Sequence, residues 1–544
     1  MGLTMTGKPW QEIRDAKKAE QAARIPPEWK LKQNPPEETR DLRPYAYKSG
    51  ILSDRELEIT DLDATSLIER IANGSYTVVE VVTAYCKRAA LAQQLANCLT
   101  EIAFAEAIER AKVLDDHYRT TGKVVGPLHG VPMSFKECFN IKGYDSSNAY
   151  ISKCFNPAQY DAYLVEIVKK AGAVPIAKTN IPQTMLVAES DNNVFGSSKN
   201  PVVAHLSCGG SSGGEGVLMA YHGSAIGIGT DVGGSIRIPA ACNGVYGYKP
   251  SFGLLPMLKY ANSTHLGLNT GIPAVCGPLA RSVRDLELLT RVVRDARPWL
   301  EDPAVMPHVF EQGAVDRKPV VGVIYQADTL TPHPPIRRAL RETAAKLEGA
   351  GLQVKEFEPA SYAAINEVTR QLFTLDGLSY AKRELAQSGE PPVPAVRTIG
   401  FWDLPSKTSE ENWSWNAKKQ ALQKEMLEKW RAAGIDIVLC PAGAHTAPRP
   451  GQWSNDSYTV TWNAMDYPAI IMPITHVDPA KDPKDTLEKP LSATDDEFYG
   501  RYDPELMAGS PVALQLVGSR LGDEQLLKDA ELIDKILKQQ HGSS

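Results

Sequence analysis

The stretch GTDVGGSIRIPA at residues 229–240 decides how the middle of this 544-residue chain folds. The apolar run at residues 225–228 before it is typical of a buried strand, and the glycines Gly233 and Gly234 predict a sharp turn. Ser235 follows that turn directly. Acyl transfer requires a nucleophile beside backbone N–H groups that face a developing oxyanion, so Ser235 is a candidate nucleophile. A buried, hydrogen-bonded structural serine is the alternative.

The residues around Ser235 supply further candidates. Asp231 and Arg237 can pair across the turn and stabilise it. A nest for an oxyanion is predicted from the backbone N–H groups of Val232, Gly233, Gly234 and Ser235.

A second candidate region is GPLHGVPMSFKE at residues 126–137. Val131, Met133 and Phe135 alternate with other residues as in a strand, which places Lys136 on the opposite face. Burial disfavours the ammonium form, so the pKa of a buried lysine falls and the amine can act as a base. A solvated lysine at a strand end is the alternative.

The third region is CGGSSGGEG at residues 208–216. Its glycines let backbone segments approach Ser211 and Ser212 closely and expose N–H groups at the start of a helix. Ser212 and Glu215 have the spacing of a capping box, which is a structural alternative for Ser212. The pattern G-x-S-x-G also occurs here, but residues 200–207 lack the strand that a nucleophile elbow needs.

Together these regions resemble the amidase signature family. Lys136, Ser211 and Ser235 occur in the family's order. The matching stretches are GPLHGVPMSFKE, the KTN of residues 178–180, CGGSSGGEG, GTDVGGSIRIPA and PVALQLVG at residues 511–518. Residues 25–29 and 49–53 are similar to fungal acetamidases, which are general amidases of small carboxamides.

The resemblance implies roles for individual residues. Ser235 would be acylated, Ser211 would follow a cis peptide bond and bridge, and neutral Lys136 would be the base. Ser211 would pass the Ser235 proton to Lys136, and the relay would reverse to protonate the departing ammonia or amine. Ser212 would assist by hydrogen bonding, and the main chain near Met185 would form part of the substrate wall. No cofactor is implied.

The chain as a whole indicates an α/β protein. Helical patterns at residues 64–72 and 78–95 precede the glycine-rich middle, and strand-like runs at residues 435–440 and 469–474 follow it. Such alternation is typical of a sheet with helices on both faces. The resemblance sharpens this to a three-layer α/β/α fold with a central mixed sheet of about eleven strands.

The expected domain organisation is simple. Residues 1–53 are predicted to form an N-terminal helix, over residues 9–24, and a proline-rich arm that wraps the body. Residues 54–540 are predicted to form a single catalytic domain. Residues 478–509 are charged, contain prolines and show no periodicity, so we expect a surface insertion there.

Composition argues against several classes of function. The 59 basic and 65 acidic residues include no long basic run, so nucleic acid is not an expected partner. No stretch approaches the roughly 20 apolar residues of a membrane span, and the N-terminus lacks a signal-peptide core, so we expect a cytoplasmic protein. The ten histidines include no H-E-x-x-H and the eight cysteines no C-x-x-C, so no metal is expected.

We therefore expect an amidase that hydrolyses small aliphatic or aryl carboxamides to carboxylic acid and ammonia. Hydrolysis of longer fatty-acid amides, N-substituted amides or carbamates stays open, as does an amide-transfer subunit of a glutamine-dependent amidotransferase. The expected partner is a small-molecule amide, and a homodimer is left open. The residues of the acyl pocket do not follow from the sequence.

Overall fold

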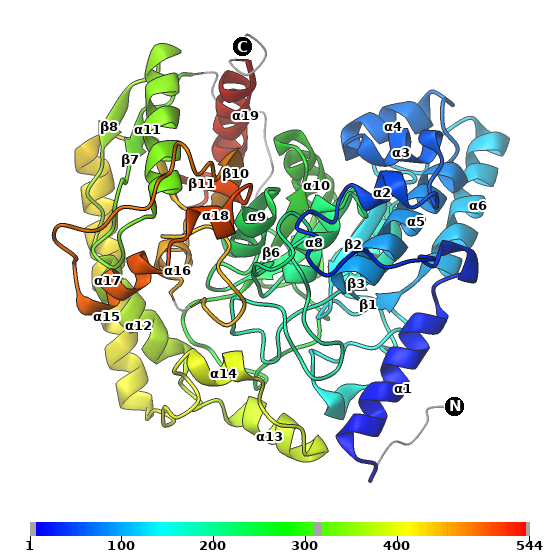
Figure 1. Ribbon diagram of the computed structural model, residues 1–544, viewed down its shortest axis with the longest axis horizontal. Helices are drawn as coiled ribbons and strands as arrows, with labels where there is room; N and C mark the ends of the chain where they lie inside the picture. The colour runs from blue at the N-terminus through cyan, green and yellow to red at the C-terminus, as the bar shows by residue number, and fades with distance from the viewer. Residues whose placement is uncertain (1–6, 308–316, 454, 540–544) are drawn as a thin grey trace.

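An eleven-stranded mixed sheet forms the centre of the computed structural model, which describes residues 7–307, 317–453 and 455–539 (Figure 1). In space the strands follow the order β1-β3-β2-β4-β6-β5-β10-β11-β9-β7-β8. The predicted α/β/α fold with about eleven strands is confirmed. The strands are β1 (Leu99–Ile102), β2 (Pro132–Lys136), β3 (Val174–Thr179), β4 (Ile226–Asp231), β5 (Tyr246–Lys249), β6 (Val275–Ala280), β7 (Val321–Val323), β8 (Val354–Glu356), β9 (Ile437–Pro441), β10 (Ala469–His476) and β11 (Pro511–Gly518).

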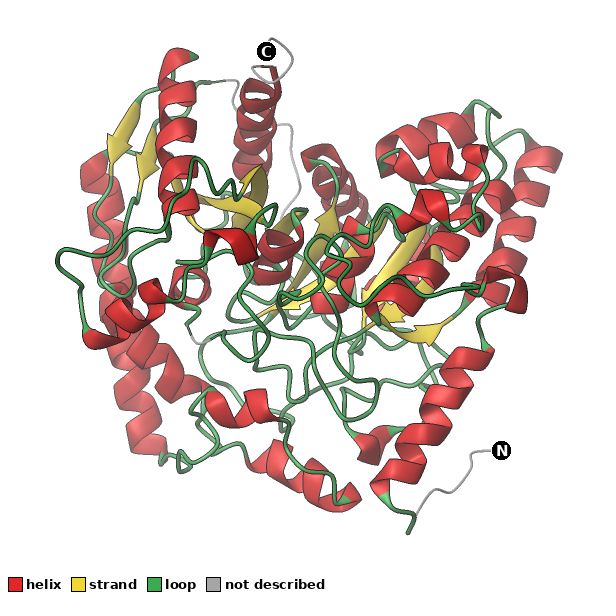
Figure 2. Cartoon of the chain, viewed as in Figure 1, coloured by secondary structure: helices red, strands yellow, loops and turns green. Residues whose placement is uncertain are grey.

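Helices cover both faces of this sheet (Figure 2). In the part of the chain that the structure describes, no helix is both long and apolar enough to cross a membrane. The α-helices are α1 (Trp10–Ala23), α2 (Tyr45–Lys48), α3 (Asp54–Asp61), α4 (Ala64–Ala72), α5 (Val78–Ala96), α6 (Phe104–Thr121), α7 (Tyr163–Lys170), α8 (Gly213–Ala220), α9 (Arg237–Asn243), α10 (Val283–Asp295), α11 (Pro334–Gly349), α12 (Tyr362–Phe373), α13 (Ser379–Ser388), α14 (Pro394–Thr398), α15 (Ser409–Ala433), α16 (Ser457–Ala464), α17 (Ala493–Gly500), α18 (Pro504–Met507) and α19 (Asp523–Gln539).

The side chains of β9 pack against helices on both faces of the sheet. Ile437 and Leu439 belong to a buried cluster that includes residues of α11 and α19. Val438 and Cys440 belong to a different cluster, with residues of α12, α15 and α16. Because successive side chains of a strand point to opposite faces, a strand between two helical layers needs apolar residues at consecutive positions.

Two helices that the sequence pattern predicted precede the glycine-rich middle. The patterns at residues 64–72 and 78–95 correspond to α4 and α5. Thr77 and Glu80 form a complete capping box at the start of α5, with each side chain accepting the other residue's backbone N–H. This box satisfies two of the N–H groups that a helix start leaves without partners.

Residues 478–509 contain two helices, α17 and α18, that the sequence pattern did not indicate. Both helices are too short to show a helical period. The segment also contributes Asp482, whose side chain is completely buried. Its Oδ1 lies 2.6 Å from Nε of Arg338 in α11.

Candidate active site

The neighbouring parallel strands β2 and β4 bring the candidate residues together. Phe135 pairs with Ile228 across the two strands, so Lys136 lies beside the C-terminal end of β4. Ser235 follows β4 in the turn that leads into α9. The carboxyl ends of parallel strands meet at one edge of a sheet, where open α/β sheets bind their ligands.

Lys136 is completely buried. Its Nζ lies 2.7 Å from Ser211 Oγ and 2.7 Å from Thr230 Oγ1. Desolvation lowers the pKa of Lys136 to about 8, although the carboxylates of Asp231 and Glu215 act in the opposite direction. A neutral amine can accept the Ser211 proton and still donate to Thr230. The alternative of a solvated lysine is therefore wrong.

Ser211 is buried against Lys136, and the peptide bond between Gly210 and Ser211 is cis, as the resemblance implied. Position 210 requires glycine, because a Cβ there would lie 2.3 Å from the carbonyl oxygen of Glu189. Ser211 and Ser235 line the same cavity. No strand among the described residues directly precedes this segment. The interpretation of G-x-S-x-G as a nucleophile elbow is therefore wrong.

Ser212 links the two serine segments and does not cap α8. Its N–H donates to the carbonyl oxygen of Ser235 at 3.0 Å, and its Oγ lies 3.3 Å from both the backbone N and O of Thr230. Helix α8 has no side-chain cap. Glu215 instead accepts hydrogen bonds from hydroxyl groups on β2 and β3, at 2.6 and 2.8 Å. The capping-box interpretation is wrong because the sheet occupies that carboxylate.

The predicted pair of Asp231 and Arg237 is present, and both side chains are completely buried. Arg237 donates to the two carboxylate oxygens at 3.0 and 3.1 Å. The same carboxylate accepts the N–H groups of Gly234 and Ile236, at 2.8 and 3.0 Å. Arg237 also donates to a carbonyl of α16 and to the amide oxygen of Gln515 in β11. The pair therefore fixes the turn to two other elements.

The predicted oxyanion nest has fewer available donors than the sequence suggested. Gly234 donates its N–H to Asp231, so this group cannot also serve an oxyanion. The hydrogen bonds among the described residues include none from the backbone N–H groups of Val232, Gly233 and Ser235. Position 234 still requires glycine, because φ is +129° and a Cβ would lie 2.3 Å from Thr459 Oγ1.

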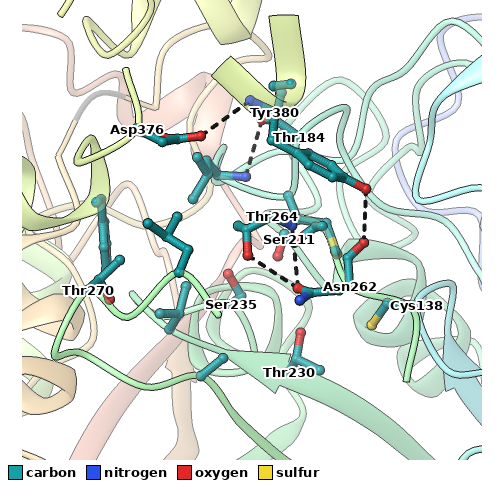
Figure 3. A pocket seen from close by; sticks show the side chains of 18 of the residues that line it. Cys138, Thr184, Ser211, Thr230, Ser235, Asn262, Thr264, Thr270, Asp376 and Tyr380 are labelled. Atoms are coloured by element: carbon teal, nitrogen blue, oxygen red, sulfur yellow. Dashed lines mark hydrogen bonds between the residues drawn. The ribbon is translucent and has the colours of Figure 1, made fainter. Parts of the chain in front are cut away.

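A cavity of about 370 Å³ opens beside the two serines (Figure 3). Met185 contributes to its wall, as the resemblance implied. Most of the surface of this wall is apolar, and its polar side chains are distributed around it. They include Asp376 and Tyr380, whose hydroxyl donates to the carbonyl oxygen of Asn262 at 3.3 Å. The apolar side chains include Leu186, Met257, Leu268, Ile272, Phe373 and Leu378.

Several supporting residues were absent from the sequence prediction. Thr230 lies inside the quoted stretch, but its contact with Lys136 depends on β2 and β4 being neighbours. Asn463 and Gln515 both bind Arg237, and they lie 226 and 278 residues away from it along the chain. No local pattern connects residues at such separations.

Known proteins are similar to this chain over the region that contains all of these residues. The family model described as Amidase matches residues 80–527. The acetamidases of Aspergillus oryzae and Emericella nidulans are each 38% identical over 542 residues, which is 97% of this chain and 99% and 98% of theirs. A solved structure described as fatty acid amide hydrolase has a TM-score of 0.93 at 33% identity, covering 97% of this chain and 95% of its own.

Proposed function

We propose that this chain, which belongs to the amidase family and is therefore an amide hydrolase, cleaves carboxamides through an acyl-enzyme on Ser235. The contact of 2.7 Å between Lys136 Nζ and Ser211 Oγ carries the proposal, because it gives a buried base one hydroxyl away from the cavity. A relay of this kind supplies both a base and an acid without histidine.

The reaction begins when Ser235 Oγ attacks the amide carbon. Ser211 takes the proton of Ser235 and passes its own to neutral Lys136. The N–H groups of Val232, Gly233 and Ser235 stabilise the oxyanion that forms. The proton returns to the amide nitrogen as the C–N bond breaks, and ammonia or an amine leaves. Water then attacks the acyl ester of Ser235 while the same relay takes its proton, and the carboxylic acid is released.

The cavity supports an apolar acyl group. Its volume of about 370 Å³ lies at the lower end for pockets that hold drug-sized ligands. Within the small aliphatic and aryl carboxamides, this space favours an aryl or medium-length alkyl group over acetyl. Longer fatty-acid amides are the second candidate, supported by the apolar wall and by the likeness to a fatty acid amide hydrolase.

The test of this function is acylation at Ser235. The purified chain is expected to hydrolyse hexanamide and benzamide, and Ser235→Ala is expected to lose more than about 10³-fold in kcat. The protein is treated with an ester whose acyl group the enzyme releases slowly, and its intact mass is then measured. The mass is expected to show the acyl group on the wild type and not on Ser235→Ala. Ser197→Ala, which changes an exposed serine, is the matched control.

Acylation of the Ser235→Ala protein would contradict the nucleophile assignment. A series of amides with two, six and twelve acyl carbons separates the two candidate substrate classes. A maximum of kcat/KM at six carbons supports the medium-length acyl group, and a maximum at twelve supports the fatty-acid amides.

A further inference from the structure

A second cavity shares part of its wall with a narrow pocket that Ser235 lines. The narrow pocket has a volume of about 30 Å³ and includes Ser235, Gly233, Phe401 and Asp456 in its wall. A larger cavity of about 170 Å³ shares Phe401 and Asp456 with it, and neither residue lines the apolar cavity described above. The larger cavity adds the polar side chains Asn366, Thr369 and Arg370 of α12. Two spaces of different polarity therefore meet at the candidate nucleophile.

Asp456 is the charged residue at this junction. Its Oδ2 would lie 3.3 Å from a Cβ built on Gly233, so the carboxylate is beside a candidate oxyanion donor. Among the described residues that line the narrow pocket, only Asp456 has a charged side chain. Burial raises the pKa of Asp456 to about 6, so the group is still mostly ionised at neutral pH.

Among the described residues, the carboxylate of Asp456 has no ion-pair partner. Although Asp456 precedes α16, its side chain makes no capping hydrogen bond there, and no described side chain donates one to it. The nearby charges of Arg237 and Asp231 are paired with each other. Arg370 lines only the larger cavity and donates to the carbonyl oxygen of Gly400 at 3.1 Å. A carboxylate in this position favours a ligand that brings a cation or a hydrogen-bond donor.

The two halves of a secondary amide extend in opposite directions from the scissile bond. An apolar acyl group fits the apolar cavity, which leaves the second cavity for the group on the amide nitrogen. We propose that this second cavity receives the amine half of the substrate and that Asp456 selects amines bearing an ammonium group. Monoacylated short diamines are the corresponding substrate class. Water cleaves the C–N bond by giving OH to the acyl carbon and H to the nitrogen, and the products are the carboxylic acid and the free diamine.

This inference rests on the proposed function, and its test compares two amides that share the hexanoyl group. N-(2-aminoethyl)hexanamide carries the ammonium group, and N-propylhexanamide is its uncharged isostere. The quantity measured is the ratio of kcat/KM for the charged amide to that for the neutral one. A general loss of activity in a variant cancels in this ratio. The ratio is expected to exceed one for the wild type and to fall about tenfold in Asp456→Asn.

Asp403→Asn is the matched control, because it removes the same charge from an exposed position that lines neither cavity. Its ratio is expected to equal that of the wild type. A wild-type ratio of one or less, or an unchanged ratio in Asp456→Asn, would overturn the role of Asp456. Failure of the wild type to hydrolyse hexanamide would instead contradict the proposed function.

A second measurement uses the wild type alone and does not depend on how Asp456→Asn folds. Inhibition of hexanamide hydrolysis is compared at neutral pH for propylamine, which is then an ammonium ion, and 1-propanol, its uncharged isostere. The ammonium ion is expected to inhibit at a concentration about tenfold lower. Equal inhibition by the two compounds would count against the selection of ammonium groups.

Discussion

Burial without a charged partner distinguishes Lys136 from Lys178, which is equally buried but pairs with a carboxylate. Two hydroxyl oxygens take the place of water at Lys136 Nζ. The carboxylate next to it in sequence, Glu137, forms an ion pair of 2.8 Å with Lys178 and so does not partner Lys136. The cost of desolvation therefore acts on the Lys136 ammonium form with little compensation, and its pKa falls to about 8.

The activity is expected to rise with pH and to level off above about 8. The ammonium form of Lys136 cannot accept a proton, so the fraction of competent enzyme grows as pH passes through this pKa. The measurement is the pH profile of kcat/KM for hexanamide, whose own charge does not change in that range. Lys136→Ala is expected to lose the rise and more than about 10³-fold in kcat.

Lys142→Ala is the control for this profile, because it removes an exposed lysine close in sequence. It is expected to retain the wild-type profile. A profile that stays flat from pH 6 to 9 in the wild type would show that Lys136 is not the group whose deprotonation permits attack.

At the scale of elements, the turn between β4 and α9 depends on Arg237. Arg237→Lys is expected to lower the free energy of unfolding by about 3 kcal/mol, because lysine cannot make the paired contacts and leaves buried acceptors unsatisfied. The turn carries Ser235, so kcat is expected to fall at least about 100-fold with a smaller change in KM. Urea unfolding and steady-state kinetics with hexanamide measure the two effects.

Arg284→Lys is the matched control for this change. Arg284 makes the same two-point contact with Asp63, at 2.6 and 2.6 Å, but its side chain is 47% exposed. Its replacement is expected to change the free energy of unfolding by less than about 0.5 kcal/mol. Equal losses in the two variants would mean that burial of the Asp231 pair is unimportant.

Helix α16 explains why part of the site could not be predicted. All eight of its residues are buried, so the stretch SYTVTWNA has no polar face and no helical period. Asp456 and Asn463, which belong to this region, were missed for the same reason. By contrast, Lys136, Ser211 and Ser235 lie in stretches whose glycines and alternation are visible locally. Sequence pattern shows which residues are unusual, and sheet order decides which of them meet.

At the scale of the whole molecule, α1 protects an edge of the sheet. It lies beside β1, the edge strand, and Gln21 donates to the carbonyl oxygens of Leu99 and Thr100 at 2.8 and 3.0 Å (Figure 1). Lys17 Nζ lies 2.7 Å from Glu101 Oε1 and 2.8 Å from Asp145 Oδ2. An exposed edge would offer unpaired carbonyl groups to another chain, and this helix occupies them instead. The N-terminal helix is therefore attached to the sheet edge by buried hydrogen bonds and ion pairs.

Lys17→Met is expected to lower the free energy of unfolding by about 3 kcal/mol, because it leaves two buried carboxylates without their cation. Lys18→Met, at the exposed neighbouring position, is expected to change it by less than about 0.5 kcal/mol. Urea unfolding of both variants makes the comparison. Adding Glu101→Gln to Lys17→Met removes one of the unpaired charges and is expected to restore part of the loss. If the double variant were less stable than Lys17→Met, packing of the lysine stem would explain the loss better than its charge.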